Sequence, residues 1–130
     1  MLCAGSRLYA TLETRPPAGA AALVSQSGAL AGAVLSWAEE QGLGFSKFVS
    51  YGNRADLDEV DLLPYLAQDP ETRVVALYVE SVADGRAFMS VLEACARQKP
   101  VVVIKAGRAG SGRRSRPFAH RLAGGGGRRL

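Results

Sequence analysis

The chain has 130 residues, 48% of them hydrophobic, which is enough for about one domain with an apolar core. No apolar run approaches the ~20 residues needed to span a bilayer, and the N-terminus has no secretory pattern. The net charge of +4 is unevenly distributed along the chain. Residues 1–107 contain nine Lys/Arg and twelve Asp/Glu, whereas residues 108–130 contain seven Arg and no acid. We therefore expect a globular domain that binds neither nucleic acid nor membranes, followed by a disordered basic tail over 109–130.

The cysteine and histidine content argues against a metal site. The two cysteines, Cys3 and Cys95, are far apart, and neither has a neighbouring residue of a metal-ligating type. A chain with one histidine is also poorly suited to zinc. We expect two free thiols, and therefore a reducing, cytoplasmic compartment and no bound metal.

Four apolar strands alternate with three amphipathic helices along the chain. Residues 1–20 are weakly patterned and contain Pro16–Pro17 and Gly19, so we expect an extended N-terminal remnant there. The pattern predicts strands over 21–25, 45–50, 73–80 and 100–104, and helices over 28–41, 56–68 and 84–98. It places Trp37 in the buried stripe of the first helix and Leu57 on the apolar face of the second. The unbroken apolar run Val74–Val79 is typical of a parallel sheet buried on both faces. The sequence thus predicts an α/β domain over 21–108 with a doubly wound parallel sheet.

Polar or glycine-containing segments follow all four predicted strands. In a parallel sheet these segments meet at one edge, and ligands bind beyond it. The four segments are Ser25–Gly28, Tyr51–Asn53, Glu80 and Lys105–Gly107. They place Gly52, Asn53 and Gly107 in the loops at that edge, where we expect the site.

The junction Val24–Leu30 is the most informative of these segments. Ser27 suits the N-cap position, and the first amides of the helix that follows have no internal partner. The helix dipole also favours anions there, and Gly28 and Ala29 leave room for one to approach, so this end can bind a phosphate or a carboxylate. The same residues would also suit an ordinary capped helix start. The acidic cluster over 56–61 likewise suits a helix start better than paired catalytic carboxylates.

Four segments together resemble the second, flavodoxin-like domain of the NDP-forming acyl-CoA synthetases. This family includes the ADP-forming acetyl-CoA synthetases and is related to the succinyl-CoA synthetase α subunit. The matching segments are Leu23–Leu30, Phe48–Asp56, Tyr78–Arg86 and Lys99–Arg108. The resemblance implies a flavodoxin-like fold. It also implies a reaction that interconverts acyl-CoA, ADP and phosphate with acid, CoA and ATP through a phosphohistidine.

The resemblance implies roles for individual residues as well. Ser27, Gly28 and Ala29 match the helix N-terminus that holds the phosphoryl group, and Glu80 matches the acid that orients the histidine. A carboxylate on one imidazole nitrogen fixes the tautomer and raises the basicity of the other nitrogen. The family uses CoA and ADP or ATP with Mg²⁺. Phosphate alone is expected on this chain, because the CoA-binding and ATP-grasp parts of the family are absent from it.

The histidine is where the chain departs from the family. The family loop reads Ser-His-Thr-Gly-x-Leu-Ala-Gly, whereas His120, the one candidate catalytic histidine, is followed by Arg121 and Leu122. With suitable synonymous codons, reading residues 118–130 from the second base gives Ser-His-Thr-Gly-Ser-Leu-Ala-Gly. We therefore hypothesise that the tail is an out-of-frame reading of the family loop. The family histidine codon would then straddle Ala119 and His120.

The sequence therefore favours a fragment of an NDP-forming acyl-CoA synthetase that has no ligase activity alone. Two alternatives remain open. One is the synthetase-like regulatory region of a protein lysine acetyltransferase, which a downstream acetyltransferase domain would indicate. The other is a non-catalytic nucleotide- or anion-binding domain, or a pseudogene product. A lack of anion at Ser27–Gly28 would favour an inert chain. The last strand also leaves a sheet edge on which edge pairing is expected.

Overall fold

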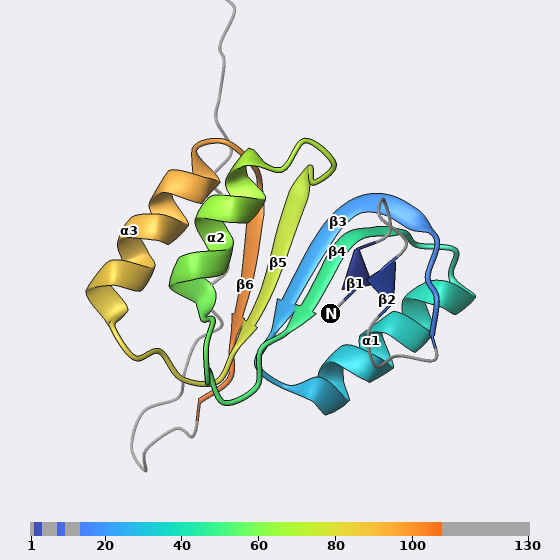
Figure 1. Ribbon diagram of the computed structural model, residues 1–130, viewed down its shortest axis with the longest axis horizontal. Coiled ribbons are helices and arrows are strands. Elements are labelled where there is room, and N and C mark those ends of the chain that lie inside the picture. The colour runs from blue at the N-terminus through green and yellow to red at the C-terminus, as the bar shows by residue number, and fades with distance from the viewer. Residues whose placement is uncertain (1, 4–7, 10–13, 108–130) are drawn as a thin grey trace, which may run out of the picture.

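The computed structural model describes residues 2–3, 8–9 and 14–107. The predictions for His120 and for a basic tail over 109–130 lie outside these residues. The parallel strands are β3 (Ala18–Ser25), β4 (Phe45–Ser50), β5 (Val74–Val79) and β6 (Val101–Lys105). The helices are α1 (Gly28–Glu40), α2 (Glu59–Gln68) and α3 (Gly85–Ala96). The predicted α/β class, with four parallel strands and three helices, is confirmed (Figure 1).

One sheet contains all the strands, in the order β2-β1-β4-β3-β5-β6. Counted along the chain, its four parallel members follow the order 2-1-3-4, as in the flavodoxin-like topology. The two-residue strands β1 (Leu2–Cys3) and β2 (Leu8–Tyr9) add an antiparallel edge, and β1 pairs with β4. Residues 1–20 were predicted to be an extended remnant, and two-residue strands are too short to show an alternating pattern.

Helices cover the two faces of the sheet unequally. Figure 1 shows α2 and α3 on one face and α1 on the other. Alternate residues of β3 therefore enter different cores. Ala22 and Val24 pack with α2 and α3, whereas Leu23 packs with Ala31, Leu35 and other residues of the α1 side. Because each helix returns the chain to the start of the next strand, α1 and α2 begin at the edge where the strands end.

The start of α2 differs from the prediction. The acidic pattern indicated a helix from residue 56, but α2 begins at Glu59. Asp58 is the N-cap, and its carboxylate accepts hydrogen bonds from the amides of Val60 and Asp61. The Asp58 amide in turn donates a hydrogen bond to the Asp61 carboxylate, which completes a capping box. Leu57, predicted to lie on the apolar helix face, precedes this cap and is 49% exposed.

Several large apolar side chains remain exposed on α1 and β6. Trp37, predicted to lie in the apolar stripe of α1, is 55% exposed. Val102 and Ile104 of β6 are 54% and 59% exposed. Because the alternate residues Val101 and Val103 pack against the α2–α3 core, Val102 and Ile104 point to the opposite face. In the described ranges β6 also has no partner strand on its outer side.

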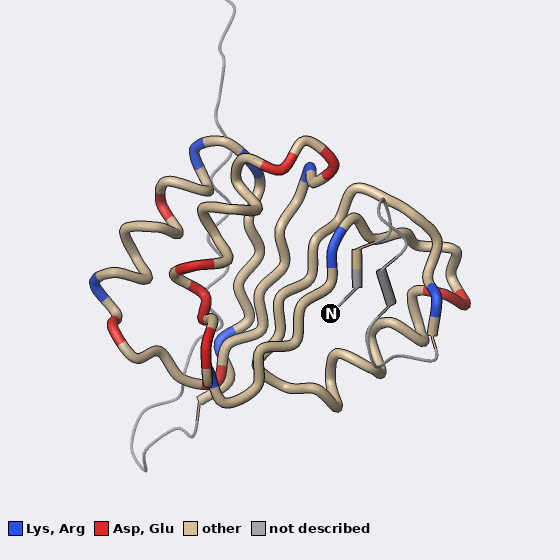
Figure 2. The backbone as a smooth tube through the Cα atoms, in the orientation of Figure 1, with Lys and Arg blue, Asp and Glu red and all other residues tan. Residues whose placement is uncertain are grey.

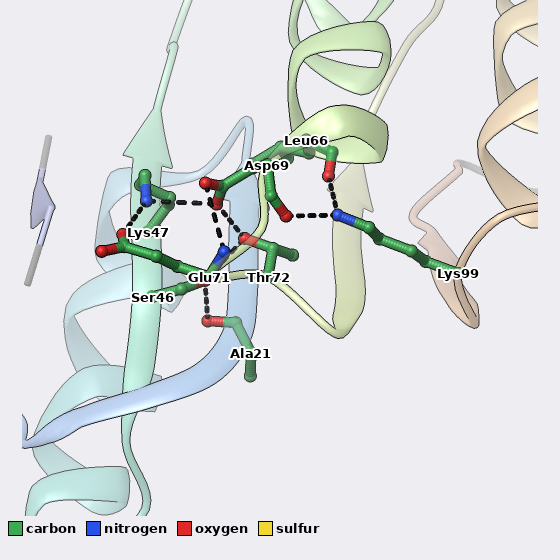
Figure 3. Close-up of polar contacts among 8 residues, drawn as sticks. All are labelled: Ala21, Ser46, Lys47, Leu66, Asp69, Glu71, Thr72 and Lys99. Atoms are coloured by element: carbon green, nitrogen blue, oxygen red, sulfur yellow. Dashed lines mark hydrogen bonds and ion pairs between the residues drawn. The ribbon is translucent and has the colours of Figure 1, made fainter. Parts of the chain in front are cut away.

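A buried polar cluster lies near the edge where the parallel strands begin, far from the strand ends (Figure 3). The Lys47 ammonium on β4 is 3.1 Å from the Asp69 carboxylate, and both side chains are less than a tenth exposed. Thr72 donates a hydrogen bond to Asp69 and shares another with Ser46. Lys99 donates to the carbonyls of Leu66 and Asp69, so the end of α2 is also attached to this cluster.

Burial and pairing act in opposite directions on the charged groups of this cluster. Burial favours a lower pKa for Lys47, but hydrogen bonds to Glu71 and Asp69 outweigh it, and the Lys47 pKa is raised. Burial favours a higher pKa for Asp69, but hydrogen bonds from Thr72 and Lys47 lower it overall. The pairing therefore keeps both groups charged in the folded state.

Candidate functional site

The N-terminus of α1 lies at the carboxyl end of β3, in the centre of the sheet. Ser27 is the N-cap: its hydroxyl accepts a hydrogen bond from the Leu30 amide at 3.2 Å, and its carbonyl accepts one from Ala31 at 3.1 Å. Within residues 14–107, neither the Gly28 amide nor the Ala29 amide has a protein acceptor. These two N–H groups are therefore available to an anion at the positive end of the helix dipole.

Serine side chains surround this turn. The buried Ser25 hydroxyl accepts a hydrogen bond from the Ser27 amide at 3.1 Å and donates to the Ser27 carbonyl at 2.8 Å. Ser50, the last residue of β4, faces Gly28, and its hydroxyl would be 3.7 Å from a Cβ atom at that position. Gly28 therefore leaves an open space beside a hydroxyl that can donate a hydrogen bond.

Glu80 follows β5, beside this turn, and its backbone is held from two neighbouring strands. The Gln26 side-chain oxygen accepts hydrogen bonds from the amides of Glu80 at 2.6 Å and Ser81 at 3.0 Å. The Lys105 ammonium donates to the Glu80 carbonyl at 2.7 Å. The Glu80 side chain is exposed, so its carboxylate can reach a ligand or a residue brought to this edge.

The loop after β4 completes this edge of the sheet. Gly52 has a φ of 51° and Arg54 a φ of 57°, so two of its residues adopt the left-handed conformation. The Arg54 guanidinium donates to both the carbonyl and the hydroxyl of Ser81. Figure 2 shows acidic positions that run from this loop into the first turn of α2, close to basic positions at the same end of the sheet.

The structure brings most of the predicted site residues to one edge. Ser27, Gly28 and Ala29 form the first turn of α1, and Glu80 is joined to this turn through Gln26. Gly52 and Asn53 lie in the loop after β4, and Gly107 lies beside the Lys105 ammonium. His120 is outside the described residues, so its position relative to Glu80 stays a prediction.

Sequence reasoning missed three residues of this edge: Gln26, Ser50 and Arg54. Gln26 could have been predicted from its position between a buried strand and a helix cap. Its side-chain amide can form hydrogen bonds there with the backbone at the end of the neighbouring strand. Ser50 ends a predicted strand and could have been included on that ground. Arg54 had no local signal, because its partner Ser81 lies 27 positions later in the chain.

The described residues do not fit a metal ion. No group of three or more His, Cys, Asp or Glu side chains suited to metal binding occurs among them. In the same ranges, no helix is long and apolar enough to cross a membrane.

Comparisons with known proteins agree on one family. The family model described as succinyl-CoA ligase like flavodoxin domain matches residues 18–124. The chain is 56% identical over 97 residues to the ADP-forming acetate–CoA ligase I of Archaeoglobus fulgidus, with coverage of 75% of this chain and 14% of that protein. It is 44% identical over 110 residues to the alpha subunit of the ADP-forming acetate–CoA ligase II of Pyrococcus furiosus, with coverage of 85% and 24%.

A solved structure gives the same result. The dinucleotide-forming acetyl-coenzyme A synthetase 1 of Ca. Korarchaeum cryptofilum, in complex with phosphate and ADP, superposes with a TM-score of 0.66 at 45% identity. The match covers 71% of this chain and 20% of that one. The chain therefore spans about a quarter or less of the length of these relatives.

Proposed function

Because the chain belongs to the succinyl-CoA ligase like flavodoxin domain family, we propose that it is the phosphoryl-holding domain of an NDP-forming acyl-CoA synthetase. The whole enzyme would convert acyl-CoA, ADP and phosphate to acid, CoA and ATP through a phosphohistidine. The observation that carries the proposal is the capped start of α1, whose Gly28 and Ala29 amides are unpaired next to Glu80. The relative solved with phosphate and ADP supports phosphate as the ligand class.

In this proposal the chain has two chemical tasks. The Gly28 and Ala29 amides would bind the phosphoryl oxygens and stabilise the negative charge that develops on them. The Glu80 carboxylate would accept a hydrogen bond from one nitrogen of a histidine, which leaves the lone pair of the other nitrogen free to attack phosphorus. The phosphorus would be that of the acyl phosphate formed from acyl-CoA and phosphate, and its bond to the acyl oxygen would break, so that the acid leaves as a carboxylate. Gln26 accepts hydrogen bonds from the Glu80 and Ser81 amides, and Lys105 donates one to the Glu80 carbonyl. These bonds support a fixed backbone location for this acid.

We infer that the histidine comes from the family loop rather than from His120 as written. The hypothesis of an out-of-frame tail places Ser-His-Thr-Gly directly after the segment that follows β6. Sequencing the genomic DNA through residues 108–130 tests this directly. Codons that cannot yield Ser-His-Thr-Gly in the shifted frame would exclude the hypothesis and leave His120 as the candidate.

The CoA-binding and ATP-grasp functions would come from other domains or subunits. One relative is named as an alpha subunit, which supports such a division, and this chain covers 24% of it. We therefore expect no ADP-dependent ATP synthesis by the purified chain, and measurable turnover would contradict the fragment interpretation. Cys95 is a buried free thiol, which supports the proposed cytoplasmic location.

Phosphate binding to the chain alone is the direct test. We expect inorganic phosphate to shift the backbone amide NMR signals of Gly28 and Ala29 in a saturable way. The start of α3 is an internal control, because the Asp84 carboxylate already accepts bonds from the Arg86 and Ala87 amides. Equal shifts at both helix starts would indicate a general ionic effect. Unchanged signals at Gly28 and Ala29 would favour a non-binding domain.

A further inference from the structure

The Glu80–Ser81 segment is the meeting point of side chains from three strand ends. Gln26 follows β3 and accepts from both amides of the segment. Lys105 ends β6 and donates to the Glu80 carbonyl. Arg54 comes from the loop after β4 and donates to the carbonyl and hydroxyl of Ser81. The location of Glu80 is therefore set by side chains that are distant in sequence.

The Arg54 contact comes from a side chain that is mostly buried. The bonds of all three side chains to this segment lie at the exposed surface, and those of Arg54 and Lys105 are charge-assisted. The Arg54 side chain as a whole is only 15% exposed, whereas Lys105 is an exposed residue with a flexible side chain. Arg54 therefore connects this segment to the interior of the domain.

Arg54 also forms an ion pair with a buried carboxylate. The Glu59 side chain is 1% exposed, and its Oε2 atom lies 3.7 Å from the Arg54 Nε atom. Among the described residues, both of these atoms and the Tyr51 hydroxyl are buried without a hydrogen-bond partner. A buried carboxylate without a nearby cation is costly, so Glu59 favours the guanidinium at this place. Arg54 thus links the start of α2 to Ser81.

The backbone of Arg54 gives an independent indication of a required side chain. Its φ of 57° is in the left-handed region, which costs a non-glycine residue about 1 kcal/mol or more. Glycine would adopt this conformation without that cost. The contacts of the Arg54 side chain with Ser81 and Glu59 can offset this cost.

We propose that Arg54 is a positioning residue that holds Ser81 and thereby fixes the direction of the Glu80 carboxylate. The inference rests on the proposed function only for the role of Glu80 as the acid that orients a histidine. The contact itself can be tested without any ligand. Arg54 does not act on the phosphoryl group in this proposal, and its effect passes through the Glu80–Ser81 segment.

The test compares Arg54→Gly, Arg54→Gly/Glu59→Gln, Arg54→Lys and the unchanged chain by NMR. Arg54→Gly relieves the backbone strain but leaves the buried Glu59 carboxylate without its nearby cation. Arg54→Gly/Glu59→Gln removes both charges, so its melting temperature should change less. Hydrogen exchange at the Glu80 and Ser81 amides should nevertheless accelerate about tenfold, which corresponds to about 1.4 kcal/mol. The three-bond couplings of the Glu80 side chain should move towards rotamer-averaged values. Arg54→Lys keeps one charged donor and should restore part of both effects.

The matched control is Arg73→Gln, which removes an exposed arginine at the opposite end of the sheet. Exchange at Glu80 and Ser81 should not change in this variant. The proposal is overturned if Arg54→Gly leaves exchange and couplings at Glu80 unchanged, or if β5 amides such as Leu77 accelerate equally. Phosphate shifts at Gly28 in the unchanged chain test the proposed function separately. The two ideas can therefore fail independently.

Discussion

At one end of the parallel sheet, Lys47 and Asp69 are buried and paired, whereas at the other end Glu80 and Lys105 are exposed. In the cluster around Asp69, hydrogen bonds and an ion pair connect the end of α2 to β4, and the Asp69 carboxylate has both Lys47 and Thr72 as partners. At the strand ends, the Gly28 and Ala29 amides are left open, and Arg54 adopts a strained backbone. Polar groups thus stabilise the fold at one edge and remain available for binding at the other.

The largest expected effect comes from breaking the buried cluster. Asp69→Asn leaves Lys47 with the half-exposed Glu71 as its carboxylate partner and removes a buried charged acceptor, so we expect a loss of about 2 kcal/mol in the free energy of unfolding. Urea denaturation measures this loss. Glu71→Gln is the matched control, because Glu71 also pairs with Lys47 but is 49% exposed, and should cost at most about 1 kcal/mol. Equal losses in the two variants would contradict the distinction between buried and exposed partners.

The same cluster predicts how stability depends on pH. The Asp69 pKa is lower in the folded state than the unfolded value of about 3.9, so its contribution is present above that value. This contribution is lost as the pH falls through the folded pKa. The Lys47 pKa is raised, so its contribution is present below about 10.5 and is lost as the pH rises through the folded pKa. Denaturation series on Asp69→Asn should show a smaller loss of stability in acid than the unchanged chain.

A change at Ser27 should affect binding and leave the fold intact. Ser27→Asp keeps a good N-cap, so stability should change by less than about 0.5 kcal/mol. The new carboxylate would repel phosphate and occupy the first amides, as Asp84 does at α3. We expect phosphate shifts at Gly28 and Ala29 to disappear. If Ser27→Asp still bound phosphate normally, the anion would have to bind elsewhere.

A smaller effect is expected from filling the space at Gly28. Gly28→Val should weaken phosphate binding about tenfold, because its methyl groups would occupy the space beside Ser50. Gly85→Val is the matched control: Gly85 is also the first residue of a helix, after the Asp84 cap, and has open space around it. It should leave phosphate binding unchanged, as NMR titration can show. Similar weakening in both variants would point to a general change in helix starts.

The elements of the fold were predicted well because each depends mainly on residues that are close together in the sequence. The apolar run of β5 and the Ser27 cap need no distant partner, and both lie where the sequence placed them. The predicted start of α2 at residue 56 was wrong by three residues, because the use of Asp58 as the N-cap depends on backbone geometry. Leu57 was wrongly assigned to the apolar face for the same reason.

Long-range polar contacts could not be predicted from the sequence. Lys47 and Asp69 are 22 positions apart, and neither residue type indicates burial by itself. The contact between Arg54 and Ser81 likewise depends on how two loops fold at the sheet edge. The site could be located because all parallel strands end at one edge, but its internal contacts required the structure.

The exposed position of Trp37 has a practical optical consequence. It is the one tryptophan of the chain and lies on α1, the helix whose start forms the proposed phosphate site. Because the indole already contacts water in the folded chain, its fluorescence maximum should shift little on unfolding. Intrinsic fluorescence would therefore report unfolding of this chain poorly. A shift of the emission to shorter wavelength would instead signal that another surface has covered α1.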